Sequence, residues 1–136
     1  MQNYSVLVGI WERSVRATHT FLPEEDIIDI KSALATEYFP HVDLYGVLSE
    51  EGAIAGFMGI SGTKLEMLFI DDCMRGRGLG TRLVESAIAM GVSSVDVNEQ
   101  NEAALGFYLA KGFHMVSRDE YDSEGRPFPI LHLALQ

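Results

Sequence analysis

Residues 75–80 read Arg75-Gly-Arg-Gly-Leu-Gly80, a glycine-rich turn between an apolar run and a helical pattern. The run, Leu65–Ile70, is expected to form a strand, and the helix should begin near Gly80 and end at Gly91. Backbone N–H groups at a helix N-terminus lack partners within the helix, and the helix dipole adds partial positive charge there. The turn is therefore predicted to bind a phosphate group.

The charge distribution supports an anionic ligand at this turn. Arg75, Arg77 and Arg82 lie in or beside it, in a chain whose net charge is −10. Such acidity argues against general nucleic-acid binding, which needs a cationic face. A dinucleotide fingerprint would need a third glycine after Gly80, and a nucleotide triphosphatase would need Gly-Lys-Ser/Thr. Both features are missing from the sequence.

Composition bounds the class of protein. The length of 136 residues predicts one domain, residues 1–136. No apolar stretch is long enough to cross a membrane, and the N-terminus lacks a secretion-signal pattern. A single cysteine, Cys73, excludes an internal disulfide and favours a cytoplasmic location. The four histidines are scattered along the chain, so we expect no zinc or other metal site.

Apolar periodicity and turn residues divide the rest of the chain into further elements. They are expected as a helix ending near residue 18, a helix from 23 to 40, a hairpin of 44–48 and 53–60, a strand at 93–97, a helix at 101–111, and closing strands at 113–117 and 128–135. A right-handed crossover through the helix after Gly80 should make Leu65–Ile70 and the strand at 93–97 parallel neighbours. The predicted fold class is α/β, with a mixed, mostly antiparallel sheet flanked by helices.

Two motifs resemble those of the GNAT superfamily of acyl-CoA N-acyltransferases. Its pyrophosphate motif, Arg/Gln-x-x-Gly-x-Gly/Ala, is matched by Arg75, Gly78 and Gly80. A second signature is matched about 25 residues later by Asn101-Glu-Ala-Ala-Leu-Gly-Phe-Tyr-Leu-Ala-Lys-Gly-Phe113. Residues 13–22 and 97–101 further resemble small bacterial members of the YjaB type. The resemblance extends from about residue 43 to residue 136.

The resemblance implies a GNAT-like fold, with two departures from the family pattern. The usual first strand is reduced to Met1–Tyr4, so the sheet is expected to begin one strand short. The position after Asp71, usually proline in the family, is Asp72 here.

The resemblance also implies a reaction, the direct transfer of an acetyl group from acetyl-CoA to a primary amine in a ternary complex. Backbone N–H groups from Gly76 to Thr81 would hold the pyrophosphate, and the backbone of the strand before the turn would pair with the pantetheine arm and hold the developing oxyanion. The expected cofactor-binding residues are Leu68, Phe69, Ile70, Arg75, Gly76, Arg77, Gly78, Leu79, Gly80, Thr81 and Asn101.

Tyr108 is the predicted general acid. It lies seven residues after Asn101, so the two residues share one face of their helix after two turns. A phenol with a reference pKa near 10 is protonated at pH 7 and can donate to a departing thiolate, whose reference pKa is near 8.5.

The proton acceptor for the amine has three candidates. Glu66 leads, because strand alternation would place it on the same face as Leu68. His19, in the connection between the first two helices, is the second candidate, and deprotonation by bulk water is the third. Aromatic residues that could line the acceptor pocket, although their spacing favours core packing, are Trp11, Phe21 and Tyr38.

The sequence leaves several alternatives open. The same cofactor site would suit a non-catalytic acyl-CoA-binding regulatory module, although Tyr108 and Glu66 together favour catalysis. The acceptor could be a lysine side chain, a peptide N-terminus, a polyamine or an aminoglycoside. Acceptance of longer acyl-CoA donors and formation of a homodimer are also left open, and no membrane or nucleic-acid partner is expected.

Overall fold

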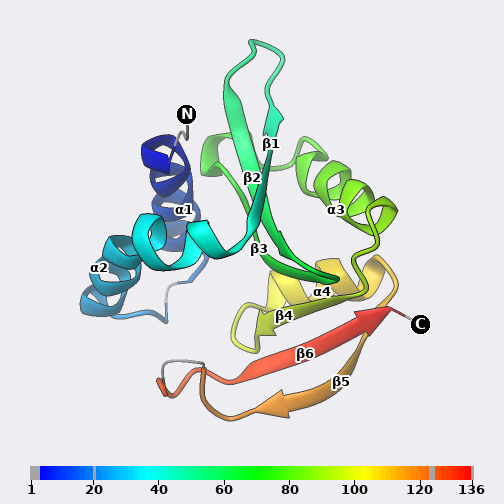
Figure 1. Cartoon of the computed structure of the whole chain (residues 1–136). Helices are drawn as coiled ribbons and strands as arrows, with labels where there is room; N and C mark the ends of the chain where they lie inside the picture. Colours follow the sequence, from blue (N-terminus) through cyan, green and yellow to red (C-terminus); the bar gives the residue numbers. More distant parts are fainter. Residues whose placement is uncertain (1–3, 20, 123–124, 136) are drawn as a thin grey trace.

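A six-stranded mixed sheet forms the centre of the molecule, in the strand order β1-β2-β3-β4-β6-β5 (Figure 1). The computed structural model describes residues 4–19, 21–122 and 125–135. The strands are β1 (Asp43–Leu48), β2 (Ile54–Ser61), β3 (Lys64–Ile70), β4 (Ser94–Asn98), β5 (Phe113–Asp119) and β6 (Ile130–Leu135). The α-helices are α1 (Tyr4–Thr18), α2 (Glu24–Ala33), α3 (Leu79–Ala89) and α4 (Glu102–Ala110). The predicted fold class is confirmed.

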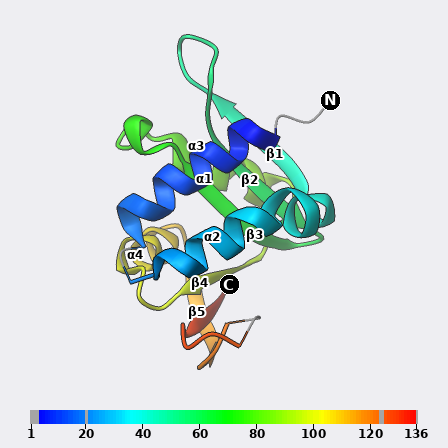
Figure 2. The same ribbon diagram turned by 90° about the vertical axis from the view of Figure 1, so that its left-hand side faces the viewer.

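The sheet separates two hydrophobic cores. Phe57 of β2 is fully buried in the core shared with α1 and α2, whereas its neighbour Met58 lies in the core shared with α3 and α4. Strand alternation explains this partition, because successive side chains point to opposite faces of a sheet. Figure 2 shows α1 and α2 side by side in front of the sheet.

The second predicted helix is less regular than expected. It begins after Pro23, as predicted, but its α-helical part ends at Ala33. A π turn follows over Leu34–Tyr38, and a 3₁₀ turn covers Phe39–His41. The prediction of one helix up to Pro40 was therefore wrong, because periodicity alone does not distinguish α from π turns.

The first strand, expected to be reduced to Met1–Tyr4, falls mostly outside the described residues, and within them the sheet begins at β1, after α1 and α2. Tyr4 is the first residue of α1, and residues 1–3 lie outside the described part. The Tyr4 ring instead packs edge-on against Phe39, with the ring centroids 5.2 Å apart.

Strands β3 and β4 are parallel neighbours, as predicted, but only at their starts. Their pairing consists of Lys64 with Ser94 and Leu65 with Val95. Beyond these pairs the two strands diverge (Figure 1). Residues 67–70 of β3 pair on the other side with β2. Their β4-facing backbone edge is therefore free of sheet pairing.

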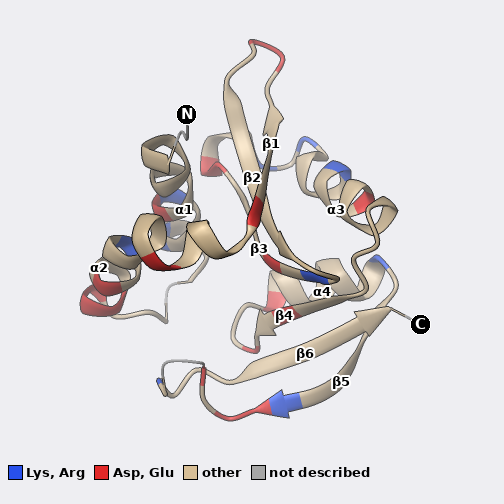
Figure 3. Ribbon diagram, in the orientation of Figure 1, with Lys and Arg blue, Asp and Glu red and all other residues tan. Residues whose placement is uncertain are grey.

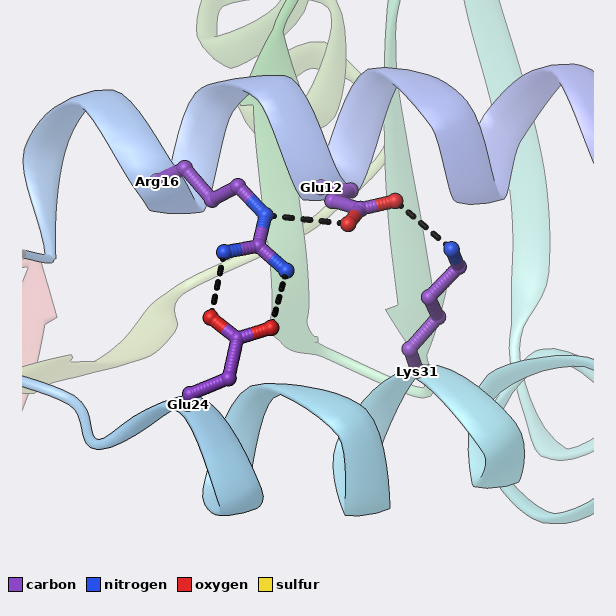
Figure 4. A network of polar contacts seen from close by, with 4 residues as sticks. All are labelled: Glu12, Arg16, Glu24 and Lys31. Carbon is purple, nitrogen blue, oxygen red and sulfur yellow. Dashed lines mark hydrogen bonds and ion pairs between the residues drawn. The ribbon is translucent and has the colours of Figure 1, made fainter.

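Ion pairs hold α2 against α1. Arg16 donates to Glu12 at 2.9 Å and to both carboxylate oxygens of Glu24 at 2.7 Å (Figure 4). Lys31 lies 2.7 Å from the other oxygen of Glu12. Exposed pairs contribute little individually. Together, however, these ion pairs join the two helices. His19 is in the connection between α1 and α2, so the network fixes both ends of the segment that contains it.

Candidate functional site

A cavity of about 320 Å³ opens where β3 and β4 diverge, and we call it the central cavity. Its wall combines the end of α1, the end of β3 and the first two turns of α4. It is lined by Ser14, Thr18, His19, Leu68, Phe69, Ile70, Arg75, Gly80, Asn101, Ala103, Ala104, Phe107 and Tyr108. The predicted strand, turn and helix residues therefore meet in one place, together with His19.

A second cavity of about 270 Å³ lies over the glycine turn, and we call it the loop cavity. Gly76 and Gly78 adopt φ angles of +80° and +75°, which side-chain-bearing residues rarely adopt. A Cβ atom at either position would meet no atom within 4 Å, so the space above the turn is open. The wall comprises Ile70, Met74, Arg75, Gly76, Gly78, Leu79, Gly80, Thr81 and Phe107.

Positive charge gathers at this turn, as Figure 3 shows at the start of α3. Arg75 lies 3.8 Å from Asp72 and lines both cavities. Within the described ranges, Arg77 and Arg82 make no ion pair, and neither lines the two cavities. The predicted anion site is thus built mainly of backbone and Arg75.

Tyr108 lies on the wall of the central cavity with only 6% of its surface exposed. Its ring packs edge-on against Phe107 and Phe113. Burial raises the pKa of Tyr108 above its ordinary value, because a phenolate would be poorly solvated there. The residue is therefore a neutral phenol throughout the physiological range.

Asn101 is the residue just before α4, and it lines the central cavity. Its side-chain oxygen accepts a hydrogen bond from the backbone N–H of Ala104 at 3.2 Å, which caps the helix. Its side-chain nitrogen lies 3.4 Å from Nε2 of His19. Sequence reasoning named both residues but had no signal that they meet. It missed Ser14 and Thr18 entirely.

The geometric argument for Glu66 was wrong. Ile60 pairs with Leu65 and Gly59 with Met67, so Glu66 is an extra residue in a β-bulge. The bulge interrupts alternation: Leu65 and Leu68 both pack in the core of α3 and α4. Glu66 instead lines a third cavity.

This third cavity, of about 490 Å³, lies between α1, the end of α2 and β3, and we call it the lateral cavity. It shares Phe69 with the central cavity. Its lining carries two carboxylates and several aromatic rings: Trp11, Ile30, Leu34, Glu37, Tyr38, His41, Val42, Ser61, Glu66, Met67 and Phe69. Lys64 lies 3.8 Å from Glu66.

The three aromatic residues named from the sequence lie in different surroundings. Trp11 is buried and, like Tyr38, lines the lateral cavity. Phe21 lines neither cavity but packs on His19 and on Phe128, with centroid distances of 5.3 and 5.7 Å.

Two further features bear on the class of site. Across the described ranges, no group of three or more His, Cys, Asp or Glu side chains comes together as metal ligands would. The same ranges contain no helix with the length and apolarity needed to cross a membrane.

Comparison with known proteins identifies the family. Residues 28–130 match the family model described as an acetyltransferase (GNAT) domain. The peptidyl-lysine N-acetyltransferase YjaB of Escherichia coli K12 is 43% identical over 129 residues, which are 94% of this chain and 87% of that protein.

Solved structures agree. The solution structure of apo YjaB from E. coli has a TM-score of 0.87 at 42% identity, covering 96% of this chain and 88% of that one. The PaiA N-acetyltransferase of Thermoplasma acidophilum, solved with coenzyme A, has the same fold, with a TM-score of 0.67 at 19% identity and coverage of 94% and 90%. The chain therefore belongs to the GNAT acetyltransferases and is an N-acetyltransferase rather than a non-catalytic module.

Proposed function

We propose that this protein transfers an acetyl group from acetyl-CoA to the side-chain amine of a lysine in a polypeptide. The observation that carries the proposal is the continuity of two cavities. The central and loop cavities share Ile70, Arg75, Gly80 and Phe107. One elongated ligand can therefore place a phosphate over the glycine turn and its other end beside Tyr108.

The residues present fit acetyl-CoA as the acyl donor. The open, positive-φ turn offers the backbone N–H groups of Gly76–Thr81 to a pyrophosphate, and Arg75 and Arg77 add charge. The unpaired edge of Leu68–Ile70 offers backbone groups to the amides of the pantetheine arm. Asn101, which lines the same cavity, completes the proposed set of binding residues.

In the proposed reaction, the neutral amine attacks the thioester carbonyl directly. A C–N bond forms and the C–S bond breaks. Tyr108 donates its hydroxyl proton to the departing thiolate, and a backbone N–H of the β3 edge stabilises the oxyanion. The alkylammonium loses two protons overall: the first is released to solvent before attack, and the second leaves the nitrogen as the C–S bond breaks and restores the hydroxyl of Tyr108, whose own proton has gone to the thiol.

The lysine acceptor is supported by a relative and by charge. The E. coli protein that shares 43% identity is named a peptidyl-lysine N-acetyltransferase. In this chain, the lateral cavity beside Phe69 carries Glu37 and Glu66, which would attract a cationic side chain. Glu66 is also a candidate base for an amine that arrives through this cavity, in competition with His19 and with bulk water.

The test uses acetyl-CoA with paired peptides that differ at one residue. One peptide of each pair contains a single lysine, and its partner carries arginine at that position. Both have blocked N-termini. We expect thiol release and acetylation, located by mass spectrometry, with the lysine peptide alone. Polyamines and peptides with free N-termini but no lysine are assayed alongside, and acetylation of these but of no lysine peptide would overturn the acceptor assignment.

A further inference from the structure

His19 lines the central cavity, and each nitrogen of its imidazole ring has an identified polar neighbour. The residue follows the last turn of α1, and its backbone N–H donates to the carbonyl of Val15 at 2.7 Å. Its ring is partly buried, packs on Phe21 and lines the same cavity as Tyr108. The two ring nitrogens have different neighbours, so the hydrogen bonds around them identify the tautomer.

Nδ1 of His19 carries the proton. The hydroxyl of Thr18 donates its single hydrogen to the backbone carbonyl of Ser14 at 2.8 Å. That hydroxyl therefore can only accept from Nδ1 of His19, which lies 2.8 Å away. The chain of bonds runs from the imidazole through Thr18 into the backbone of α1.

Nε2 of His19 carries the lone pair. The backbone N–H of Ala104 fixes the side-chain oxygen of Asn101 as an acceptor, so the amide nitrogen of Asn101 faces His19. An amide nitrogen only donates, and its 3.4 Å distance from Nε2 makes this a long bond. Two independent contacts thus select the same tautomer and leave a weakly engaged lone pair in the cavity.

We propose that Nε2 of His19 accepts the proton of the attacking amine, and that Thr18 is the positioning residue that holds the imidazole in the required tautomer. This assignment rests on the proposed amine acetylation. The N–H bond of the ammonium breaks, its electron pair becomes available for attack, and the proton bonds to Nε2 to give an imidazolium. The imidazolium then returns the proton to solvent.

The surroundings of His19 suit this role. Burial lowers the pKa of His19 below its ordinary value, so the imidazole is neutral and able to accept at pH 7. In the described part of the chain, the other charged or titratable side chains on the cavity wall are Arg75, from the loop before α3, and Tyr108, from α4. Among the residues that the structure describes, no carboxylate lines this wall, and Glu66 lines the lateral cavity instead.

The test compares pH profiles of kcat/KM with acetyl-CoA and a single-lysine peptide. A base of lowered pKa gives the wild type a plateau from about pH 7 upward, because the ammonium and the neutral imidazole are then both the dominant forms. His19→Gln should lose about a hundredfold in kcat and show a rate that rises tenfold per pH unit, because only amine already neutral in solution can react. Glu66→Gln should keep the plateau.

Thr18 is tested by a pair of substitutions. Thr18→Val removes the hydroxyl and should lower kcat about tenfold, whereas Thr18→Ser restores it. Thr36→Val, at an exposed position of the π turn, is the matched control and should leave the rate unchanged. Nitrogen-15 NMR of the free wild type should report Nδ1–H for His19, and Thr18→Val should shift the ring towards Nε2–H.

Each outcome decides the assignment. A plateau that survives in His19→Gln but disappears in Glu66→Gln would overturn it in favour of Glu66, and a plateau that survives in both would also overturn it. An Nε2–H tautomer in the wild type would overturn it without any assay of activity. If no lysine peptide is acetylated but a polyamine is, the acceptor assignment fails, and the same profiles are measured with the polyamine.

Discussion

Arg13 binds both carboxylate oxygens of Asp71, with distances of 2.9 Å from Nε and 2.8 Å from Nη2. The pair joins the middle of α1 to the residue that follows β3, across 58 positions of sequence. Asp71 is buried, and its backbone N–H also donates to Ala55 of β2 at 2.8 Å. The start of the segment that leads from β3 to the glycine turn is therefore fixed to both a helix and the sheet.

We expect Arg13→Gln to destabilise the fold by about 1–3 kcal/mol, because it leaves the buried Asp71 carboxylate without its charged donor. The Arg13 guanidinium holds the pKa of Asp71 below its ordinary value. The carboxylate's contribution is therefore complete above about pH 4 and is lost as the pH falls through the lowered pKa. Urea unfolding at pH 7 and pH 3 measures both effects.

The control for Arg13→Gln is Arg118→Gln. Arg118 binds both oxygens of Glu99 with similar geometry, but both side chains are exposed. Its loss should destabilise the fold clearly less than the loss of Arg13, because a solvent-exposed ion pair contributes little to stability. An equal decrease in the free energy of unfolding for the two variants would show that the burial of Asp71 adds nothing to the strength of its ion pair.

Gly78→Asp should weaken acetyl-CoA binding at least tenfold, because it places a carboxylate where the phosphate is expected. Gly78→Asn is the matched control: both residues tolerate the positive φ of +75° better than other side chains do, and they differ mainly in charge. Calorimetry should therefore give a smaller loss for Gly78→Asn. Identical affinities for the two folded variants would contradict an anion site at this turn.

Tyr108→Phe should lower kcat about a hundredfold and leave acetyl-CoA affinity near wild type, because only the proton donor is removed. The raised pKa of Tyr108 means that its ionisation should produce no alkaline fall in rate below pH 10. Tyr45→Phe, at an exposed position of β1, is the control. A rate of Tyr108→Phe equal to wild type, with chemistry rate-limiting, would remove Tyr108 from the acid role.

His132 should make the fold less stable as the pH rises. Nε2 lies 2.7 Å from Asp119 and Nδ1 lies 2.7 Å from Asp96, and these carboxylates raise the pKa of His132. Its stabilisation is therefore complete below about pH 6.5 and is lost as the pH rises through the raised pKa.

The measurement is the difference in Tm between wild type and His132→Gln. This difference should be largest at pH 6 and shrink towards pH 9. A difference independent of pH would mean that the ring acts only through packing.

The sequence by itself determined the local elements of the site. Three features depend only on residues a few positions apart. They are the backbone conformations of Gly76 and Gly78, the capping of α4 by Asn101, and the placement of Asn101 and Tyr108 on one side of the helix. Such features follow from backbone geometry and helical repeat, which neighbouring residues dictate. The two family motifs could be recognised in the sequence, and could indicate the fold, because each is contained in a short segment.

Only the tertiary structure decided how the candidate bases are placed. The pairing of β2 with β3 makes Glu66 the extra residue of a β-bulge, and its side chain therefore lines the lateral cavity rather than the central cavity. His19 reached Asn101 across 82 positions because α1 packs over the point where β3 and β4 diverge. No local pattern encodes either outcome. Strand register and helix docking are fixed by the burial of whole faces, and they bring together residues that the sequence keeps far apart.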